Sequence, residues 1–161
     1  MDTPNGLPAI IATFGDVHAF VDDTGVLTPQ WQNEHLSTSA LPFPLALSWN
    51  PNVKVSKITC HRLLVETFEQ VFAEIVRQGL SDSVVTFGGC FNFRQEKASV
   101  KLSTHAWGIA IDLNPESNAQ GTPGNMDHGV VEIFDNAGFE WGGNWPEPRT
   151  DAMHFQFCSG Y

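Results

Sequence analysis

Residues 103–112 read STHAWGIAID, and near the C-terminus the chain reads DAMH from Asp151 to His154. The two stretches supply two imidazoles and a carboxylate, those of His105, His154 and Asp112, which could hold one zinc ion. They also supply a further carboxylate, Asp151. A catalytic zinc site needs this set of groups, because three protein ligands leave one position open for water and a nearby base takes the proton of that water.

The first stretch predicts a strand over residues 108–113 with Asp112 on its polar face. Successive side chains of a strand point to opposite faces. The core face then carries Ile109, Ile111 and Leu113. Asp112 shares the other face with Gly108 and Ala110, whose small size leaves open space above the carboxylate. His105 precedes this strand, where the chain can curl back over the site.

The second stretch predicts a closing strand over residues 153–157 with the same division of faces. The predicted core residues are Met153, Phe155 and Phe157. His154 and Gln156 share the opposite face. Each strand thus presents one candidate ligand on its polar face.

The other predicted elements are two helices and one more strand. Apolar side chains recur at spacings of three and four over residues 60–78, and Gly79 follows as a C-terminal cap. Residues 126–137 fit a second helix, and residues 84–87 fit a buried strand. Because helices and strands do not alternate regularly, we expect an α+β fold and not a doubly wound parallel sheet.

The size of the chain predicts a single domain over residues 1–161, because 161 residues with 42% apolar content can bury one core. Residues 1–55 are rich in proline and predict an irregular N-terminal wrap with short strands or turns. Residues 60–158 are expected to form the core of this domain, and they contain the motifs described below.

Charge and hydropathy exclude several classes of partner. The net charge of −10 argues against nucleic acid, whose binding needs clustered Lys and Arg. No apolar run approaches the roughly 20 residues that cross a bilayer, so no membrane insertion is expected. The N-terminus has neither the basic region nor the long apolar region of a signal peptide. We expect a monomer.

Cys60, Cys90 and Cys158 are too few and too irregularly spaced for a disulfide framework. Buried free thiols are the simplest interpretation. One disulfide is the alternative if the protein works outside the cytoplasm.

Three motifs together resemble one family of enzymes. They are Ser-x-His-x-x-Gly-x-Ala-x-Asp from Ser103, Trp-Gly-Gly-x-Trp from Trp141, and Asp-x-Met-His-Phe from Asp151. Residues 87–94, FGGCFNFR, add a fourth similarity. The set resembles the zinc D-alanyl-D-alanine carboxypeptidase and L-alanyl-D-glutamate endopeptidase family, which cuts peptidoglycan stem peptides and includes phage endolysins. The similarity covers about residues 60–158.

This resemblance implies that His105, Asp112 and His154 bind one Zn²⁺ per chain and that Asp151 is the catalytic carboxylate. It also implies that Arg94 steadies a carbonyl or carboxylate of the substrate and that Ser103 lies near the site. Trp107, Trp141 and Trp145 are candidate walls of the cleft, with burial in the core as the alternative for each.

One departure follows Arg94, where the chain continues QEKAS over residues 95–99. Many relatives are expected to carry a second basic residue and a glycine there. The departure concerns the subsites and not the metal centre.

The resemblance implies a small antiparallel sheet with flanking helices, as in the hedgehog signalling domain. Its implied function is an L-alanyl-D-glutamate endopeptidase similar to phage endolysins. A D-alanyl-D-alanine carboxypeptidase uses the same zinc chemistry and is the first alternative. A non-catalytic peptidoglycan- or zinc-binding module is the second, and it would have no need of a base at Asp151.

The expected compartment follows from the substrate. Peptidoglycan lies outside the cytoplasmic membrane, yet no export signal is recognised. We therefore expect a protein that is made in a host cytoplasm during infection by a bacteriophage and acts on the cell wall once a pore releases it. An enzyme carried by the virion and delivered from outside is the alternative.

Overall fold

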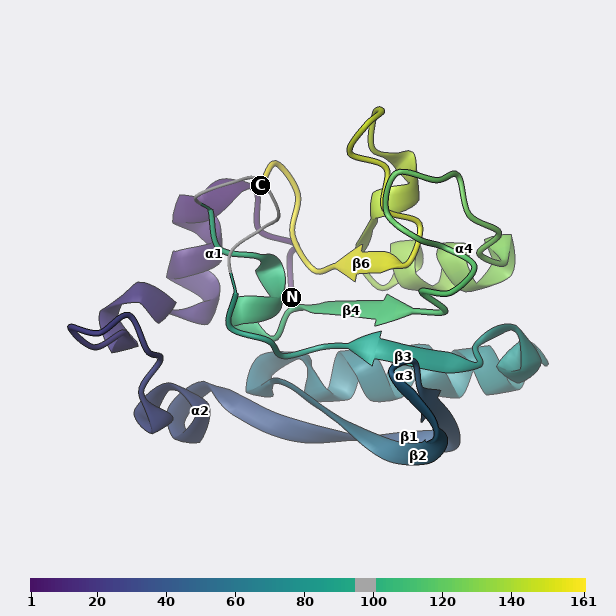
Figure 1. Ribbon diagram of the computed structural model, residues 1–161, viewed down its shortest axis with the longest axis horizontal. Coiled ribbons are helices and arrows are strands. Elements are labelled where there is room, and N and C mark those ends of the chain that lie inside the picture. Colours follow the sequence, from purple (N-terminus) through teal and green to yellow (C-terminus); the bar gives the residue numbers. More distant parts are fainter. Residues whose placement is uncertain (95–100) are drawn as a thin grey trace.

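The computed structural model describes residues 1–94 and 101–161 (Figure 1). Within these residues six strands form one sheet, in the order β2-β1-β3-β4-β6-β5. The long strands β1 (Leu36–Leu47) and β2 (Asn50–His61) form a hairpin at one edge. The shorter strands are β3 (Thr86–Gly89), β4 (Ala110–Leu113), β5 (Glu140–Trp141) and β6 (His154–Gln156).

The sheet is mixed. Neighbouring strands run antiparallel except β1 and β3, which are parallel over two residue pairs. The expected α+β class with flanking helices is confirmed, whereas the expectation of a wholly antiparallel sheet misses this pairing. The chain passes through β2 and a helix between β1 and β3, and this crossover permits the parallel pairing.

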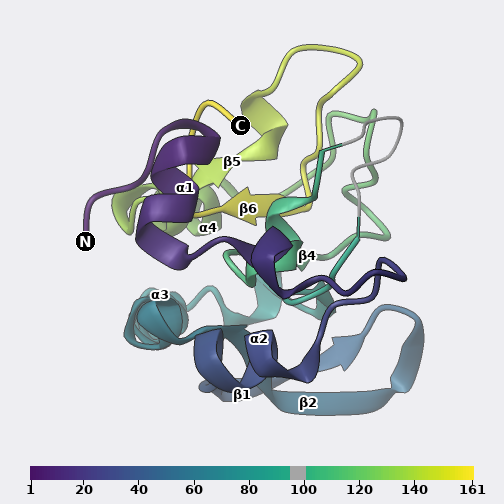
Figure 2. The ribbon, with the colours of Figure 1, turned by 90° about the vertical axis from the view of Figure 1, so that its left-hand side faces the viewer.

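Two helices cover one side of the sheet, and loops gather on the other (Figure 2). Helix α3 (Val65–Arg77) packs on β1 through Phe68, Val71, Phe72 and Ile75. Helix α4 (His128–Asn136) buries Phe134, whose ring stacks on Phe155 of β6 with centroids 4.2 Å apart. Because Phe155 points toward α4, its neighbours His154 and Gln156 point to the loop side of the sheet.

The predicted elements exist, with shifted ends. The helix expected over 60–78 begins only at Val65, because residues 60 and 61 end strand β2. Gly79 follows it with a φ of 73°, as expected of a C-terminal cap. The strand expected over 84–87 is Thr86–Gly89.

The prediction of an irregular wrap over residues 1–55 is wrong in part. The segment contains helix α1 (Gly6–Phe14), helix α2 (Pro29–His35), all of β1 and the start of β2. Pro42 and Pro44 suggested irregular structure, but they lie where the register of the hairpin shifts, between Ala40 and Leu45. Prolines are tolerated at such a bulge because no ladder hydrogen bond is needed from them.

The three cysteines are free and buried, in agreement with the simpler of the two interpretations. A search for spanning segments in residues 1–94 and 101–161 found no helix with the length and apolar character that crossing a membrane requires.

Candidate metal centre

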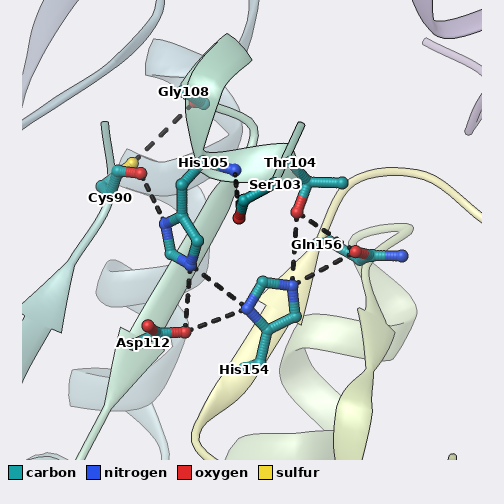
Figure 3. Close-up of polar contacts among 8 residues, drawn as sticks. All are labelled: Cys90, Ser103, Thr104, His105, Gly108, Asp112, His154 and Gln156. Carbon is teal, nitrogen blue, oxygen red and sulfur yellow. Dashed lines mark hydrogen bonds and ion pairs between the residues drawn. The ribbon is translucent and has the colours of Figure 1, made fainter. Parts of the chain in front are cut away.

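Three side chains from separate elements converge over the paired strands β4 and β6 (Figure 3). Strands β4 and β6 pair so that Asp112 is opposite His154, and the His154 Nδ1 lies 2.9 Å from the Asp112 Oδ1. His105 comes from the 3-10 turn Thr104–Trp107. Its Nε2 lies 3.2 Å from the Asp112 Oδ1 and 3.2 Å from the His154 Nδ1. The geometry confirms that the chain curls back over the site.

Local backbone features hold His105 above the strand. Ser103 caps the turn, and its Oγ accepts a hydrogen bond from the His105 amide at 3.4 Å. Gly108 ends the turn with a φ of 70°, a left-handed conformation that favours glycine. A Cβ atom at position 108 would also lie 2.9 Å from the backbone nitrogen of His61, so a larger residue would clash with the backbone there.

The outer nitrogen of each imidazole faces a carbonyl oxygen. The His105 Nδ1 lies 2.6 Å from the Cys90 carbonyl oxygen, and the His154 Nε2 lies 3.2 Å from the Gln156 Oε1. The amide group of Gln156 is held in this orientation from two sides, since its Nε2 donates to the Cys158 carbonyl and its Oε1 accepts from the Thr104 hydroxyl. A carbonyl oxygen can accept a hydrogen bond but cannot donate one. Each outer nitrogen must therefore be the donor, so it carries the single N–H of the neutral ring.

It follows that the inner nitrogens, His105 Nε2 and His154 Nδ1, present lone pairs to the Asp112 carboxylate. Three acceptors then face one another within 2.9–3.2 Å. Acceptors repel at this distance unless a cation or additional protons lie between them. Two imidazole nitrogens and a carboxylate oxygen, each ring oriented by an outer carbonyl, are a fitting donor set for zinc.

When protons take the place of a metal, the inner nitrogens donate to Asp112 and the rings carry positive charge, and the pKa values of this state show the same demand for positive charge. Burial by itself raises the pKa of Asp112, but the charges and hydrogen bonds of His105 and His154 outweigh it and hold this pKa well below the usual value. Burial by itself lowers the pKa of His154, but its hydrogen bond with Asp112 and the charges of Asp112 and Asp151 raise it above the ordinary value. Both shifts favour a positive charge at the site.

The site opens into a cleft with a cavity of about 530 Å³. Six of the residues predicted for the site line it directly, and they are Arg94, Ser103, Asp112, Trp145, Asp151 and His154. The ring centroid of Trp145 lies 5.4 Å from that of His154.

Asp151 occupies the turn just before β6. Its carbonyl accepts a hydrogen bond from the His154 amide at 3.1 Å, and its amide donates to the Gly142 carbonyl at 2.9 Å. A Cβ atom on Gly142 would lie 2.5 Å from the Asp151 carbonyl oxygen, so the backbone of Asp151 packs directly on this glycine. The turn therefore fixes the backbone of Asp151, and Asp151 and the last candidate ligand line the same cavity.

The structure decides between the two interpretations of Trp107 and Trp141, and it corrects the prediction for Met153. Trp107 is fully buried and donates from its Nε1 to the Gly15 carbonyl at 2.9 Å, so it belongs to the core. Trp141 donates to the Ala152 carbonyl at 2.8 Å and lies outside the lining of the cavity. Met153 lines the cavity and is only half-buried, whereas the alternation of β6 predicted it in the core. Met153 precedes the first residue of β6, so strand alternation does not govern it.

Other residues of the site were not predicted. The His105 Nδ1 donates to the backbone carbonyl of Cys90. Because every residue has such a carbonyl, the sequence does not indicate which one accepts this hydrogen bond. The alternation of the strand predicts Gln156 on the same face as His154, but it does not predict that Gln156 orients the ring of His154. Lys101 and Arg149 also line the cavity, and only folding brings them there. The departure over residues 95–99 lies outside the described residues.

Comparison with known families agrees with this geometry. The family model described as D-alanyl-D-alanine carboxypeptidase matches residues 96–157. The matched stretch contains His105, Asp112, Asp151 and His154 and begins just after Arg94. A search of curated proteins gave no match. The family match confirms the resemblance noted from the motifs.

Proposed function

We propose that the chain is a zinc-dependent peptidoglycan peptidase that hydrolyses peptide bonds in stem peptides, because residues 96–157 match the family model described as D-alanyl-D-alanine carboxypeptidase. The observation that carries this proposal is the convergence of three acceptors, His105 Nε2, His154 Nδ1 and Asp112 Oδ1, on one point of the cleft. A structural role alone would not favour three mutually repelling atoms in this arrangement.

His105, Asp112 and His154 would hold the zinc ion. Bound zinc supplies a Lewis acid that can lower the pKa of water from 15.7 to about 7. Two neutral imidazoles and one carboxylate leave the site with a net charge near +1, which suits a reaction that develops negative charge on a carbonyl oxygen.

Asp151 is proposed as the general base and acid. It lines the same cavity as Asp112 and His154, and its backbone is fixed by Gly142. The carboxylate would take a proton from the attacking water and pass it to the leaving amine.

Arg94 is proposed to bind the substrate carbonyl or carboxylate next to the scissile bond. It lines the cavity, and its own carbonyl accepts a hydrogen bond from the Ser103 amide at 2.9 Å, which ties Arg94 to the turn that carries His105. A planar guanidinium offers two parallel hydrogen bonds to an oxyanion or carboxylate.

We favour an L-alanyl-D-glutamate endopeptidase similar to phage endolysins. The support is the length of the cleft, because a second pocket of about 290 Å³ shares Lys101, Trp145, Arg149 and Tyr161 with the first. A cleft that continues into this second pocket offers room for a peptide longer than the two residues that flank the bond. The description of the matching family favours the alternative, a D-alanyl-D-alanine carboxypeptidase.

Digestion of purified peptidoglycan, followed by mass spectrometry of the new termini, tests the proposal. New amino-terminal glutamate is expected for the endopeptidase, and released D-alanine for the carboxypeptidase. A chelator should abolish either product, and added zinc should restore it. A zinc-loaded protein that binds peptidoglycan but releases nothing would overturn the enzymatic proposal in favour of a binding module.

The proposed place of action is the cell wall. Expression in a bacterial cytoplasm should be harmless until chloroform or a co-expressed pore permeabilises the inner membrane, after which culture turbidity should fall. The Asp151→Asn protein is the control. Equal turbidity for both proteins after permeabilisation would contradict the endolysin-like role in that host.

A further inference from the structure

A cluster of positive charge lies beside the proposed metal centre. The chain has 8 Lys and Arg against 18 Asp and Glu, yet Arg94, Lys101 and Arg149 all line the cavity that contains Asp112 and Asp151. Lys101 and Arg149 also line the second pocket, where Glu140 is the acidic residue among the described lining. An acidic chain thus places three of its 8 Lys and Arg residues around one cavity.

Lys101 and Arg149 each lie over an aromatic ring. The Lys101 Nζ lies 5.1 Å from the centroid of the Tyr161 ring, and the Arg149 Cζ lies 5.8 Å from the centroid of the Trp145 ring. A cation over an aromatic face is attracted by the quadrupole of the ring. The ring contacts favour these positions of the cationic ends, and both residues are exposed to solvent.

The two rings are themselves anchored. The Tyr161 hydroxyl donates to the Leu102 carbonyl at 2.8 Å. The Trp145 Nε1 donates a hydrogen bond to the carboxylate of Glu140, which is the acidic residue that lines the second pocket. The ring of Trp145 also lies beside that of His154, so Trp145 is in contact with both Arg149 and a residue of the metal centre.

We propose that Lys101 and Arg149 form an anion subsite that binds a free carboxylate of the substrate peptide, at a residue next to the one that contributes the scissile carbonyl. This inference rests on the proposed function. A glutamate residue linked through its side-chain carboxyl keeps its α-carboxylate free, so the favoured endopeptidase substrate carries such a group. Arg149 offers the planar fork that matches a carboxylate, and Lys101 adds a point charge.

Two stem peptides that differ only in this group, a carboxylate in one and a carboxamide in the other, test the subsite. The wild-type enzyme should cleave the carboxylate peptide with a kcat/KM roughly 10- to 100-fold higher, because a hydrogen bond to a charged group contributes about 1.5–3 kcal/mol. The preference should shrink as salt is added, since both cations are exposed. Equal cleavage of the two peptides by the wild-type enzyme would overturn the subsite and leave the proposed function standing.

Variants locate the preference. In the double variant Lys101→Met, Arg149→Gln the ratio of the two kcat/KM values should fall to near one. The matched control is Lys54→Met, Lys57→Met, which removes the same two positive charges from exposed positions on β2, at the far edge of the sheet. The control should keep the wild-type ratio, and a full preference in the Lys101, Arg149 double variant would assign the carboxylate to another site.

Binding separates failure of the subsite from failure of the proposed function. If zinc-loaded wild-type protein cleaves neither peptide, the proposed function fails. Calorimetric titration of both peptides into the Asp151→Asn protein still measures the difference between carboxylate and carboxamide. Equal affinities in that titration would overturn the subsite on their own.

Discussion

The Nε2 of His105 lies 3.2 Å from the Nδ1 of His154, although the two residues are 49 positions apart in the chain. Each ring turns its protonated nitrogen outward to a carbonyl oxygen, so both inner nitrogens are acceptors. The folded chain therefore presents a site whose own atoms repel and which a cation stabilises. The following predictions concern the groups that orient this site and those that would use it.

Gln156 should tune the affinity for metal. Gln156→Leu keeps the volume and the burial of the side chain but removes the oxygen that faces the His154 Nε2. Loss of such an outer partner typically costs 10–100-fold in metal affinity, so zinc should bind about 10–100-fold more weakly. Competition with a chromogenic chelator measures this. Gln120→Leu, which changes another residue of the same cavity, is the control, and equal affinities for both variants would remove Gln156 from the account.

Asp151 should matter for turnover and not for the metal. Asp151→Asn preserves the shape of the side chain but cannot accept the proton of water. We expect a rate loss of roughly 10²–10⁴-fold, the usual size of general acid–base catalysis, with one zinc retained. Asp82→Asn, at an exposed position, should keep the wild-type rate. Normal turnover by Asp151→Asn would exclude this residue from the mechanism.

Arg94 should need its planar group as well as its charge. Arg94→Lys retains the positive charge and loses the fork, so we expect lower activity with zinc still bound. Arg62→Lys, an exposed arginine that donates to the Asn33 carbonyl far from the cleft, is the matched control. Peptide cleavage and zinc content are measured together. If Arg94→Ala were as active as the wild type, the proposed contact with substrate would be wrong.

His61 should make the fold sensitive to acid. It is buried, and its Nε2 lies 3.0 Å from the Phe14 carbonyl oxygen. Burial, together with the nearby charges of His35 and Arg62, lowers its pKa from 6.5 to about 4, although the hydrogen bond to Phe14 opposes the shift. A depressed folded-state pKa means that stability is complete above pH 6.5 and is lost as the pH falls toward 4.

The measurement is the free energy of unfolding of the wild type and of His61→Asn at several pH values. Between pH 7 and pH 4 the wild type should lose roughly 3 kcal/mol more than the variant, from about 1.36 kcal/mol per pKa unit. The comparison cancels the contributions of groups common to both proteins. Parallel pH profiles would contradict this role of His61.

Local patterns in the sequence predicted the part of the site that strands supply. Alternation along residues 108–113 and 153–157 placed Asp112 and His154 on one face, and the pairing of β4 with β6 brings them together. The tryptophans could not be assigned in this way. Trp107 shares the short turn of His105 yet points into the core, while Trp145 lines the cleft, and only tertiary packing separates the two outcomes.

The hairpin of β1 and β2 was missed for a local reason. Proline argues against a strand because it cannot donate to the ladder, and Pro42 and Pro44 fall inside β1. The register shift that accommodates them depends on the partner strand, so residues 36–47 alone do not reveal it. Lys101 and Arg149 lie 48 positions apart and meet only because residues 101–104 and the turn before β6 border one cavity.

The zinc content of the purified chain tests the central claim most directly. Native mass spectrometry of the wild type should find one zinc ion per chain, and Asp112→Ala and His154→Ala should each lose it. His128→Ala, which removes an exposed histidine of α4, should keep it. A wild-type chain that cleaves stem peptides while free of metal, or an Asp112→Ala chain that binds zinc as tightly as the wild type, would contradict the account.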